Sequence, residues 1–333
     1  MQDNSFSAFL KKSFARRESS LLILLILLLV PITVRSPQFI SMKNISTILN
    51  DMAILVIVSI GEFYVILSNG IDLSVGSVIA FTGMACGMLN EAHPELPAPL
   101  LLVVGIGIGA ILGLFNGVLV AYGKIPPIIT TLGTVSIYRG MTFLLSGGTW
   151  VTAYEMTDSY IALPRTTFLG ISVLLWIAFA VIALFYYFSR YTRTGREVYA
   201  IGGNPNAAKF VGVNESRVRL VVFLISGSLS GLAGSLWTAR YASAVNEMAT
   251  GFEMQAVAAC VLGGVNFAGG AGGIVGVAIG TLFLGVITNA LPVIYLSVFW
   301  QTCVQGLIVL FALAMNTISD QRKNRKLLAQ RRG

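Results

Sequence analysis

Five polar residues whose side chains could do chemistry lie inside long apolar runs or at their edges. They are Asp51, Glu62, Asp72, Ser74 and Arg139. Charged groups at membrane depth are costly, and they usually face the protein interior or a water-filled cavity. We therefore assign the last four to a translocation pathway, with Asp72 and Ser74 near its inner end. Structural roles are the alternative: Asp72 as the N-cap of the next helix, or Glu62 paired with Arg139. Asp51, near the start of its run, fits the membrane interface.

Residues that could support metal or covalent chemistry are scarce. His93 is the only histidine, and Cys86, Cys260 and Cys303 all fall in apolar runs. Packing of free thiols in the core explains the cysteines, and a histidine-based metal site is excluded. No convergent set of acid, base or metal ligands exists, which argues against a membrane enzyme. We expect no catalytic residue, no metal and no cofactor bound by this chain.

The composition is that of an integral membrane protein. Hydrophobic residues make up 56%, charged residues only 11%, and the mean hydropathy is +0.82. A soluble domain would have about 25% charged residues. The formal net charge of +8 is explained by basic cytoplasmic loops, so it does not indicate a nucleic-acid partner.

The apolar runs predict an all-α polytopic protein with about ten transmembrane helices in a compact bundle. The runs lie near 18–35, 46–68, 72–89, 98–121, 128–147, 169–189, 218–238, 254–272, 274–291 and 296–316. The turns at 68–72 and 272–274 are tight, and Gly70 is expected to end the second helix. Many of the 35 glycines fall in these runs, where they let helix backbones approach closely. Examples are Gly105, Gly107, Gly109, Gly113, Gly263, Gly264, Gly269, Gly270, Gly272 and Gly273.

The distribution of basic residues predicts the orientation. With both ends of the chain in the cytoplasm, most of the 22 Lys and Arg residues fall in inside segments, as the positive-inside rule requires. The expected organisation is a cytoplasmic N-terminal segment at 1–19, a transmembrane domain at 20–316 and a basic cytoplasmic tail at 317–333. The longest outside loop, 148–168, carries Trp150, Glu155 and Asp158, and we expect an extracytoplasmic partner to bind there.

The segment 190–219 is the only long internal stretch that is both polar and basic. Asn204 can cap a helix, Pro205 suits its first turn, and Gly212 suits the position just past its end. This pattern predicts a helix of about seven residues, roughly 10 Å long. No P-loop sequence occurs in the chain, so ATP binding would have to come from another protein. The segment is either an ordered cytoplasmic loop or a docking site.

Four motifs give the chain its family resemblance. They are the runs Gly70-IDLSVGS-Val78, Lys124-IPPIITTLGT-Val135, Thr194-GREVYAIGGNPNAAKFVG-Val213 and Ala256-VAACVLGGVNFAGGAGGIVG-Val277. The chain resembles, over roughly residues 20–315, the permease subunits of bacterial ATP-binding-cassette importers for monosaccharides. That group includes ribose, xylose, arabinose, rhamnose and autoinducer-2 permeases. Two departures are Asn69, where the family usually has glycine, and Glu62, where it usually has a neutral residue.

The resemblance implies a multi-pass protein of the bacterial inner membrane and a set of partners. Two cytoplasmic ATP-binding subunits would hold ATP and Mg, a periplasmic or lipid-anchored sugar-binding protein would dock outside, and a second copy or a sister permease would complete the transporter. The 190–219 segment would contain the coupling helix, about Pro205 to Val211, which docks in a groove of the ATPase. The residues expected at this contact are Arg196, Asn204, Pro205, Ala207, Ala208, Lys209, Phe210, Val211 and Gly212. Ala207, Ala208, Phe210 and Val211 would form an apolar surface, with Arg196 and Lys209 near acidic rims.

Two other functions remain open from the residues alone. The substrate could be a nucleoside, which related permeases import. The protein could also be a secondary transporter driven by an ion gradient, although its scattered charges do not form the carboxylate relay of a proton-driven pump.

Overall fold

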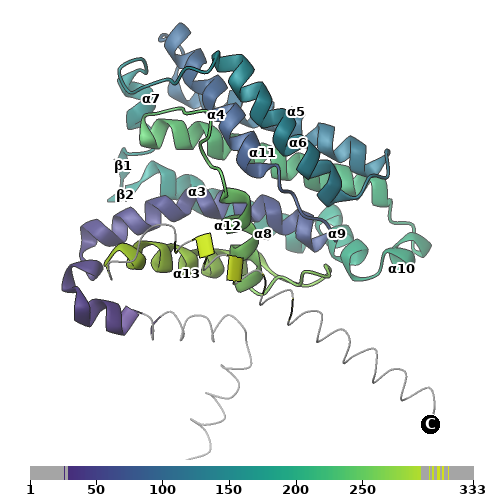
Figure 1. Ribbon diagram of the computed structural model, residues 1–333. Coiled ribbons are helices and arrows are strands. Elements are labelled where there is room, and N and C mark those ends of the chain that lie inside the picture. Colours follow the sequence, from purple (N-terminus) through teal and green to yellow (C-terminus); the bar gives the residue numbers. More distant parts are fainter. Residues whose placement is uncertain are drawn as a thin grey trace, which may run out of the picture.

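The computed structural model describes residues 26, 29–293, 300, 302, 303, 306, 307, 310 and 314. The predicted segments 1–19 and 317–333 and most of the predicted first and last spans lie outside the described residues. The described part is mostly helical (Figure 1). Its elements are η1 (Pro37–Ile40), α3 (Met42–Leu67), α4 (Val75–Ala92), α5 (Ala98–Ala121), α6 (Pro127–Ser146), α7 (Asp158–Ala162), β1 (Thr167–Phe168), β2 (Ile171–Ser172), α8 (Val173–Tyr191), α9 (Arg193–Gly203), α10 (Pro205–Phe210), α11 (Glu215–Tyr241), α12 (Phe252–Leu262) and α13 (Ile274–Val293).

Six described helices are long and apolar enough to cross a membrane: α3, α5, α6, α8, α11 and α13. The expectation of a multi-pass helical protein is therefore confirmed, whereas the count of ten is not. Helix α4 has 18 residues but is less apolar than these six.

The predicted span at 254–272 is wrong. Helix α12 stops at Leu262 after 11 residues, and residues 263–273 form a loop in which Gly264, Gly269, Gly270 and Gly272 have positive φ angles. Mean hydropathy counts glycine as nearly neutral, so an apolar run can hide a helix end.

Helix α3 is the centre of the bundle. From Met52 to Leu67 every residue is buried, and the helix packs against α8, α11, α12 and α13 as it crosses the molecule (Figure 1). Even its aromatic residues find internal partners: the Tyr64 hydroxyl donates to the Phe185 carbonyl of α8 at 2.9 Å.

Helices α5 and α11 cross at glycines. A Cβ atom built on Gly109 would collide with the carbonyl oxygen of Gly227, and one on Gly227 would lie 2.6 Å from the Cα of Gly113. Gly105 faces Gly231 in the same way. The predicted close approach is confirmed for these residues but not for Gly107, which has no atom within 4 Å of its ideal Cβ position.

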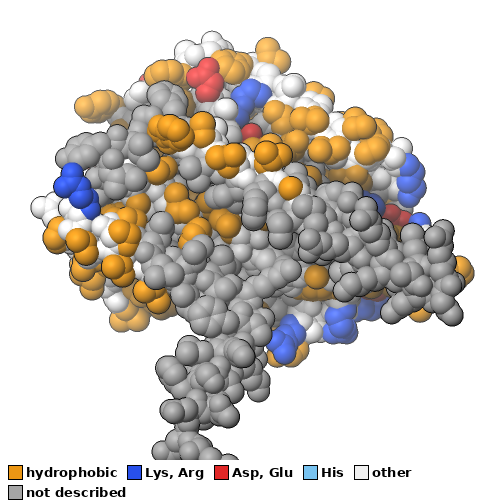
Figure 2. Space-filling model, turned by 60° about the horizontal axis from the view of Figure 1, so that its bottom comes forward, with side chains coloured by type: hydrophobic (Ala, Val, Ile, Leu, Met, Phe, Trp, Pro, Cys, Tyr) orange, Lys and Arg blue, Asp and Glu red, His pale blue; other side chains and the backbone are white. Residues whose placement is uncertain are grey.

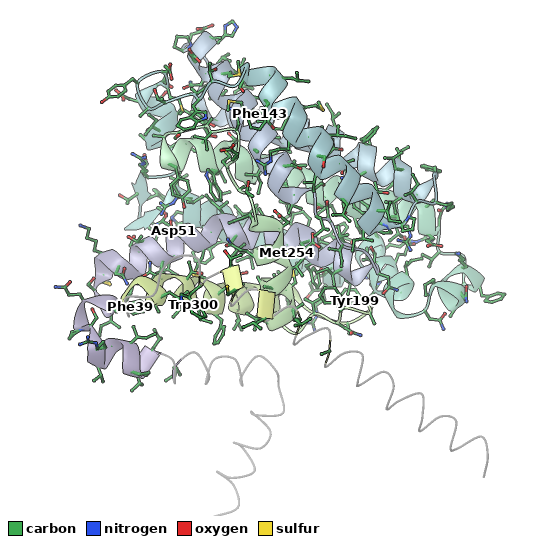
Figure 3. All side chains as sticks on the ribbon, viewed as in Figure 1. Phe39, Asp51, Phe143, Tyr199, Met254 and Trp300 are labelled. Atoms are coloured by element: carbon green, nitrogen blue, oxygen red, sulfur yellow. The ribbon has the colours of Figure 1, made fainter. Side chains whose placement is uncertain are left out.

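The two ends of the bundle carry different structures. At one end lie α9 and α10, and at the other lie α7 and the β1–β2 hairpin (Figure 1). The hairpin pairs Thr167 with Ser172 and Phe168 with Ile171. Tyr199 and Asp51, labelled in Figure 3, mark the two ends. In the face shown in Figure 2, hydrophobic side chains cover much of the described surface and most Lys and Arg side chains lie toward its margins, as a protein surrounded by lipid requires.

Candidate functional site

The turn between α3 and α4 positions the buried polar residues. Asn69, with φ of +64°, takes the left-handed position at the end of α3. The Gly70 N–H donates to the Val65 carbonyl at 2.9 Å and the Asn69 N–H to the Ile66 carbonyl at 3.0 Å, which is a Schellman C-cap. The expectation that Gly70 ends this helix is therefore wrong by one residue, because asparagine also tolerates this conformation.

Asp72 is fully surrounded by donors. Its Oδ1 accepts from the backbone N–H of Ser74 at 3.0 Å and from the Ser74 hydroxyl at 2.5 Å. Its Oδ2 accepts from the Ser226 hydroxyl of α11 at 2.8 Å. Such contacts favour a carboxylate in a buried place. The proposed N-cap role of Asp72 is wrong: Ser74 is the residue that precedes α4, and Asp72 makes a turn two residues earlier.

The same cluster continues into α5 and α6. Asn116 donates from Nδ2 to the Ser74 hydroxyl oxygen at 2.9 Å, and the Tyr138 hydroxyl donates to Asn116 Oδ1 at 3.2 Å. Asn116 has no exposed surface, and Tyr138 has only 2%. Ser226, Asn116 and Tyr138 were not predicted as site residues, although polar side chains inside apolar helices are the signal that would have found them.

Glu62 lies one step from this cluster. Its Oε1 accepts from the backbone N–H of Asp72 at 3.1 Å. Its Oε2 is buried and has no hydrogen-bond partner in the structure. Glu62, Asp72 and Ser74 thus lie together in one buried cluster.

Arg139 does not join them. Its Nη1 donates to the carbonyl oxygens of Asn246 and Met248, both at 2.9 Å, so the proposed pair with Glu62 is wrong. A different pair of charged residues is in contact: Asp51 forms an ion pair with Arg240. Arg139 holds the loop between α11 and α12 against α6.

Helix α10 has the predicted caps. The Asn204 side chain accepts from the Ala207 N–H at 3.0 Å, and Pro205 occupies the first turn. Gly212, with φ of +85°, takes the left-handed position after the helix. The helix ends at Phe210, one residue earlier than predicted.

The side chains of α10 face two ways. Phe210 is 92% exposed and Val211 79%, and Ala207 is also exposed. Ala208 was expected on this apolar surface but is only 3% exposed. It packs inward because it lies on the side of the helix opposite the exposed Phe210. The outward surface is therefore narrower than predicted.

Two basic residues near α10 differ in their surroundings. Lys209 forms an ion pair with Glu215 at 2.7 Å, whereas Arg196 is exposed and has no ion pair with a described residue. Arg196 lies on α9, a helix that was not predicted because its sequence is polar and basic.

Helix α9 is hydrogen-bonded and tightly packed against the end of α3 and the glycine-rich loop at 263–273. The Gly270 N–H donates to the Leu67 carbonyl at 3.0 Å, and Asn69 Nδ2 donates to the Gly202 carbonyl at 3.2 Å. A Cβ on Gly202 would collide with the Leu67 carbonyl and lie 2.5 Å from the Gly270 nitrogen. Tyr199 adds a hydrogen bond to the Gly272 carbonyl at 3.0 Å. The α9–α10 unit and the turn that carries Asp72 are therefore in direct contact.

The opposite end has an anchored loop. Val151 pairs with Ala244 in an isolated bridge, and the buried Tyr160 hydroxyl donates to the Ser235 carbonyl at 2.8 Å. Trp150 is 59% exposed and Tyr154 fully exposed. The backbone N–H of Thr152 and then its hydroxyl lower the pKa of Glu155, which keeps this carboxylate ionised.

Comparison with known proteins identifies the family. A family model described as "Branched-chain amino acid transport system / permease component" matches residues 44–313. The chain belongs to this family of permease components. It is a non-catalytic, multi-pass inner-membrane subunit of an ATP-binding-cassette importer, whose ATPase is a separate subunit.

The curated relatives are similar to this chain over most or all of their length. The ribose import permease protein of Haemophilus influenzae is 36% identical over 326 residues, 97% of this chain and 100% of that protein. The galactose/methyl galactoside import permease protein of Escherichia coli K12 is 33% identical, covering 95% of this chain and 99% of the relative. The autoinducer 2 import system permease protein of E. coli K12 is 34% identical, with 90% and 86% covered. No solved structure matches significantly.

Proposed function

We propose that this chain is the permease subunit of a binding-protein-dependent importer of a monosaccharide or a related small sugar-like molecule. The observation that carries the proposal is the similarity, at 33–36% identity, to permeases named for ribose and galactose import over nearly their full lengths. A nucleoside and an ion-coupled mechanism remain the alternatives.

Transport in this proposal follows alternating access. A loaded binding protein docks at the 148–168 loop, where Trp150 and Tyr154 offer exposed aromatic surface. ATP and Mg bind to the two cytoplasmic ATPase subunits and close them. The pathway forms against a second copy of this chain or a sister permease.

The coupling step uses α10. Its exposed Phe210 and Val211 suit an apolar groove in the ATPase, in the manner of other helix-in-groove contacts. Movement of α10 would reach the α3–α4 turn through α9, because Gly202 touches Leu67 and Asn69. That turn carries Asp72, whose bonds to Ser74 and Ser226 join α4 to α11. A shift at the ATPase would thus be transmitted to the helices around the buried polar cluster.

The proposal is tested by uptake in proteoliposomes that contain the full importer. We expect ATP-dependent uptake of D-ribose, D-galactose or D-xylose. Phe210→Asp should abolish this uptake and the co-purification of the ATPase, because a charge would enter the apolar groove. Phe210→Leu is the matched control and should keep both.

Three results would count against parts of the proposal. Normal uptake by Phe210→Asp would remove the coupling role of α10. Uptake of L-leucine but of none of the sugars would show that the substrate is a branched-chain amino acid, as in the family description. Uptake driven by an ion gradient without the ATPase would favour a secondary transporter.

A further inference from the structure

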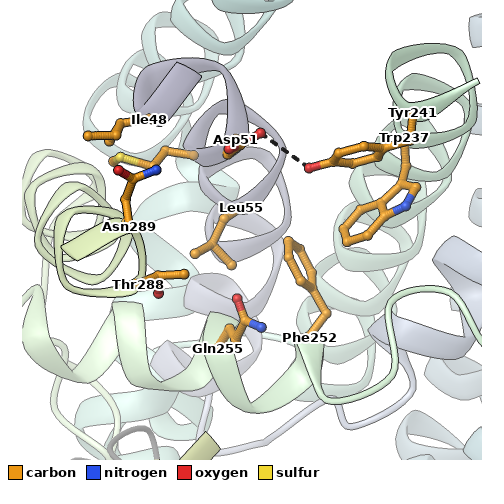
Figure 4. A pocket seen from close by; sticks show the side chains of 11 residues that line it. Ile48, Asp51, Leu55, Trp237, Tyr241, Phe252, Gln255, Thr288 and Asn289 are labelled. Atoms are coloured by element: carbon orange, nitrogen blue, oxygen red, sulfur yellow. Dashed lines mark hydrogen bonds between the residues drawn. The ribbon is translucent and has the colours of Figure 1, made fainter. Parts of the chain in front are cut away.

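A cavity at the end of the bundle opposite α10 has the lining of a carbohydrate site. It has a volume of about 240 Å³ and lies between α3, α11, α12 and α13 (Figure 4). Sites for drug-sized ligands usually have about 300–1,000 Å³, so this cavity suits a smaller molecule. Its residues take no part in the polar cluster around Asp72.

One wall of the cavity is aromatic. Trp237 and Tyr241 lie one turn apart on α11, with ring centroids 5.1 Å apart. Phe252 of α12 packs edge-on against Trp237 at 5.0 Å, which fixes the indole. Rigid aromatic side chains offer an apolar surface at low entropic cost, and the C–H face of a sugar ring is the part of a carbohydrate that can pack on it.

The other wall presents neutral hydrogen-bonding groups. Gln255, Thr288 and Asn289 line the cavity, and Figure 4 shows their side chains around its space. None of the three side chains has a hydrogen bond to a described residue. Amides and hydroxyls both donate and accept, which matches the hydroxyl groups of a sugar, since these also do both.

Among the described lining residues Asp51 is the only charged one, and it is already paired. Asp51 forms an ion pair with Arg240 and accepts a hydrogen bond from the Tyr241 hydroxyl at 3.3 Å. The part of the lining that the structure describes therefore offers no unpaired cation for a carboxylate and no unpaired anion for an ammonium group. A zwitterionic amino acid would be poorly held, whereas a neutral polyhydroxyl compound fits.

We propose that this cavity binds a neutral monosaccharide during transport, with the sugar face on Trp237 and its hydroxyls on Gln255, Thr288 and Asn289. The inference rests on the proposed function. It adds that the permease itself contacts the sugar and contributes to selection, so that specificity is not set by the binding protein alone.

The test compares sugars within one transporter. The full importer is reconstituted with one binding protein, and uptake is measured for D-ribose, D-galactose, D-xylose and single-deoxy analogues of the best substrate. Gln255→Ala and Asn289→Ala should change the ratio of rates between a sugar and its deoxy analogue by about 5-fold, the effect of one lost hydrogen bond. Because the same binding protein serves every variant, a changed ratio reports a contact within the permease.

Met254→Ala is the control, since Met254 lies beside Gln255 on α12 but does not line the cavity. It should leave the ratio unchanged. If an alanine variant fails to assemble, Thr288→Val, which removes only a hydroxyl, is measured in its place.

The outcomes separate the two proposals. Unchanged ratios in the cavity variants, whether or not the absolute rates fall, would overturn the sugar site and leave the proposed function standing. Absence of uptake of every sugar by the unmodified importer would instead remove the proposed function.

Discussion

Two carboxylates share one buried cluster, but only one of them has hydrogen-bond donors at both of its oxygens. Asp72 receives three hydrogen bonds from Ser74 and Ser226. Glu62 accepts one, from the Asp72 N–H, and its second oxygen has no partner. The Asp72 side chain therefore holds the turn through its own hydrogen bonds. Glu62 contributes to stability mainly as the acceptor for a backbone N–H.

Replacing Glu62 separates its hydrogen bond from its charge. Glu62→Leu should lower the free energy of unfolding by about 1–3 kcal/mol, because the buried Asp72 N–H would lose its acceptor. Glu62→Gln keeps a carbonyl oxygen at this position and should change stability by less than about 1 kcal/mol. Thermal unfolding of both variants in detergent measures the difference. Equal destabilisation would show that the charge, not the acceptor, is what the fold needs.

Single residues also show what a sequence can reveal. Asp72 and Ser74 stand out in the sequence because polar groups in apolar runs are unusual. The contact of Asp72 with Ser226 joins positions 154 residues apart, and nothing in the local pattern of either residue indicates the other. The inward position of Ala208 was missed for a similar reason, since its burial depends on which neighbours pack around α10.

Among the elements, those defined by local signals were predicted best. Helix α10 was placed to within one residue because Asn204, Pro205 and Gly212 mark its ends. The end of α12 was missed, since the glycines after Leu262 stay within an apolar run. Hydropathy does not reveal helix α9, because many of its residues are polar.

The crossing of α5 and α11 gives a prediction for an element pair. Gly227→Ala should reduce stability by about 1–3 kcal/mol or prevent assembly, because the added methyl group meets backbone atoms of α5. Gly107→Ala is the matched control on α5. It should be neutral or slightly stabilising, since its Cβ meets nothing within 4 Å and alanine favours a helix. Thermal stability and expression level in membranes are the measurements. A tolerated Gly227→Ala would mean that the two helices can move apart at little cost.

At the scale of the whole molecule, the orientation can be measured. The positive-inside rule predicts that the α9–α10 end faces the cytoplasm. Cys86 and Cys260 are buried, and Cys303 is exposed. A Cys303→Ala chain should therefore react little with thiol reagents before a new cysteine is introduced. In that background Tyr154→Cys should react with an impermeant maleimide in intact cells. Phe210→Cys should react only in inverted membrane vesicles. The reverse pattern would invert the topology.

The glycine crossing of α5 and α11 also has a consequence for biosynthesis. The chain emerges from the ribosome in order, so α5 enters the membrane well before α11 has been made. At about 5–20 residues per second the interval is on the order of ten seconds. During that time Gly105, Gly109 and Gly113 lack the α11 backbone that packs against them in the finished bundle. The packing of these glycines is therefore a late event in assembly, because it cannot be completed before α11 has entered the membrane.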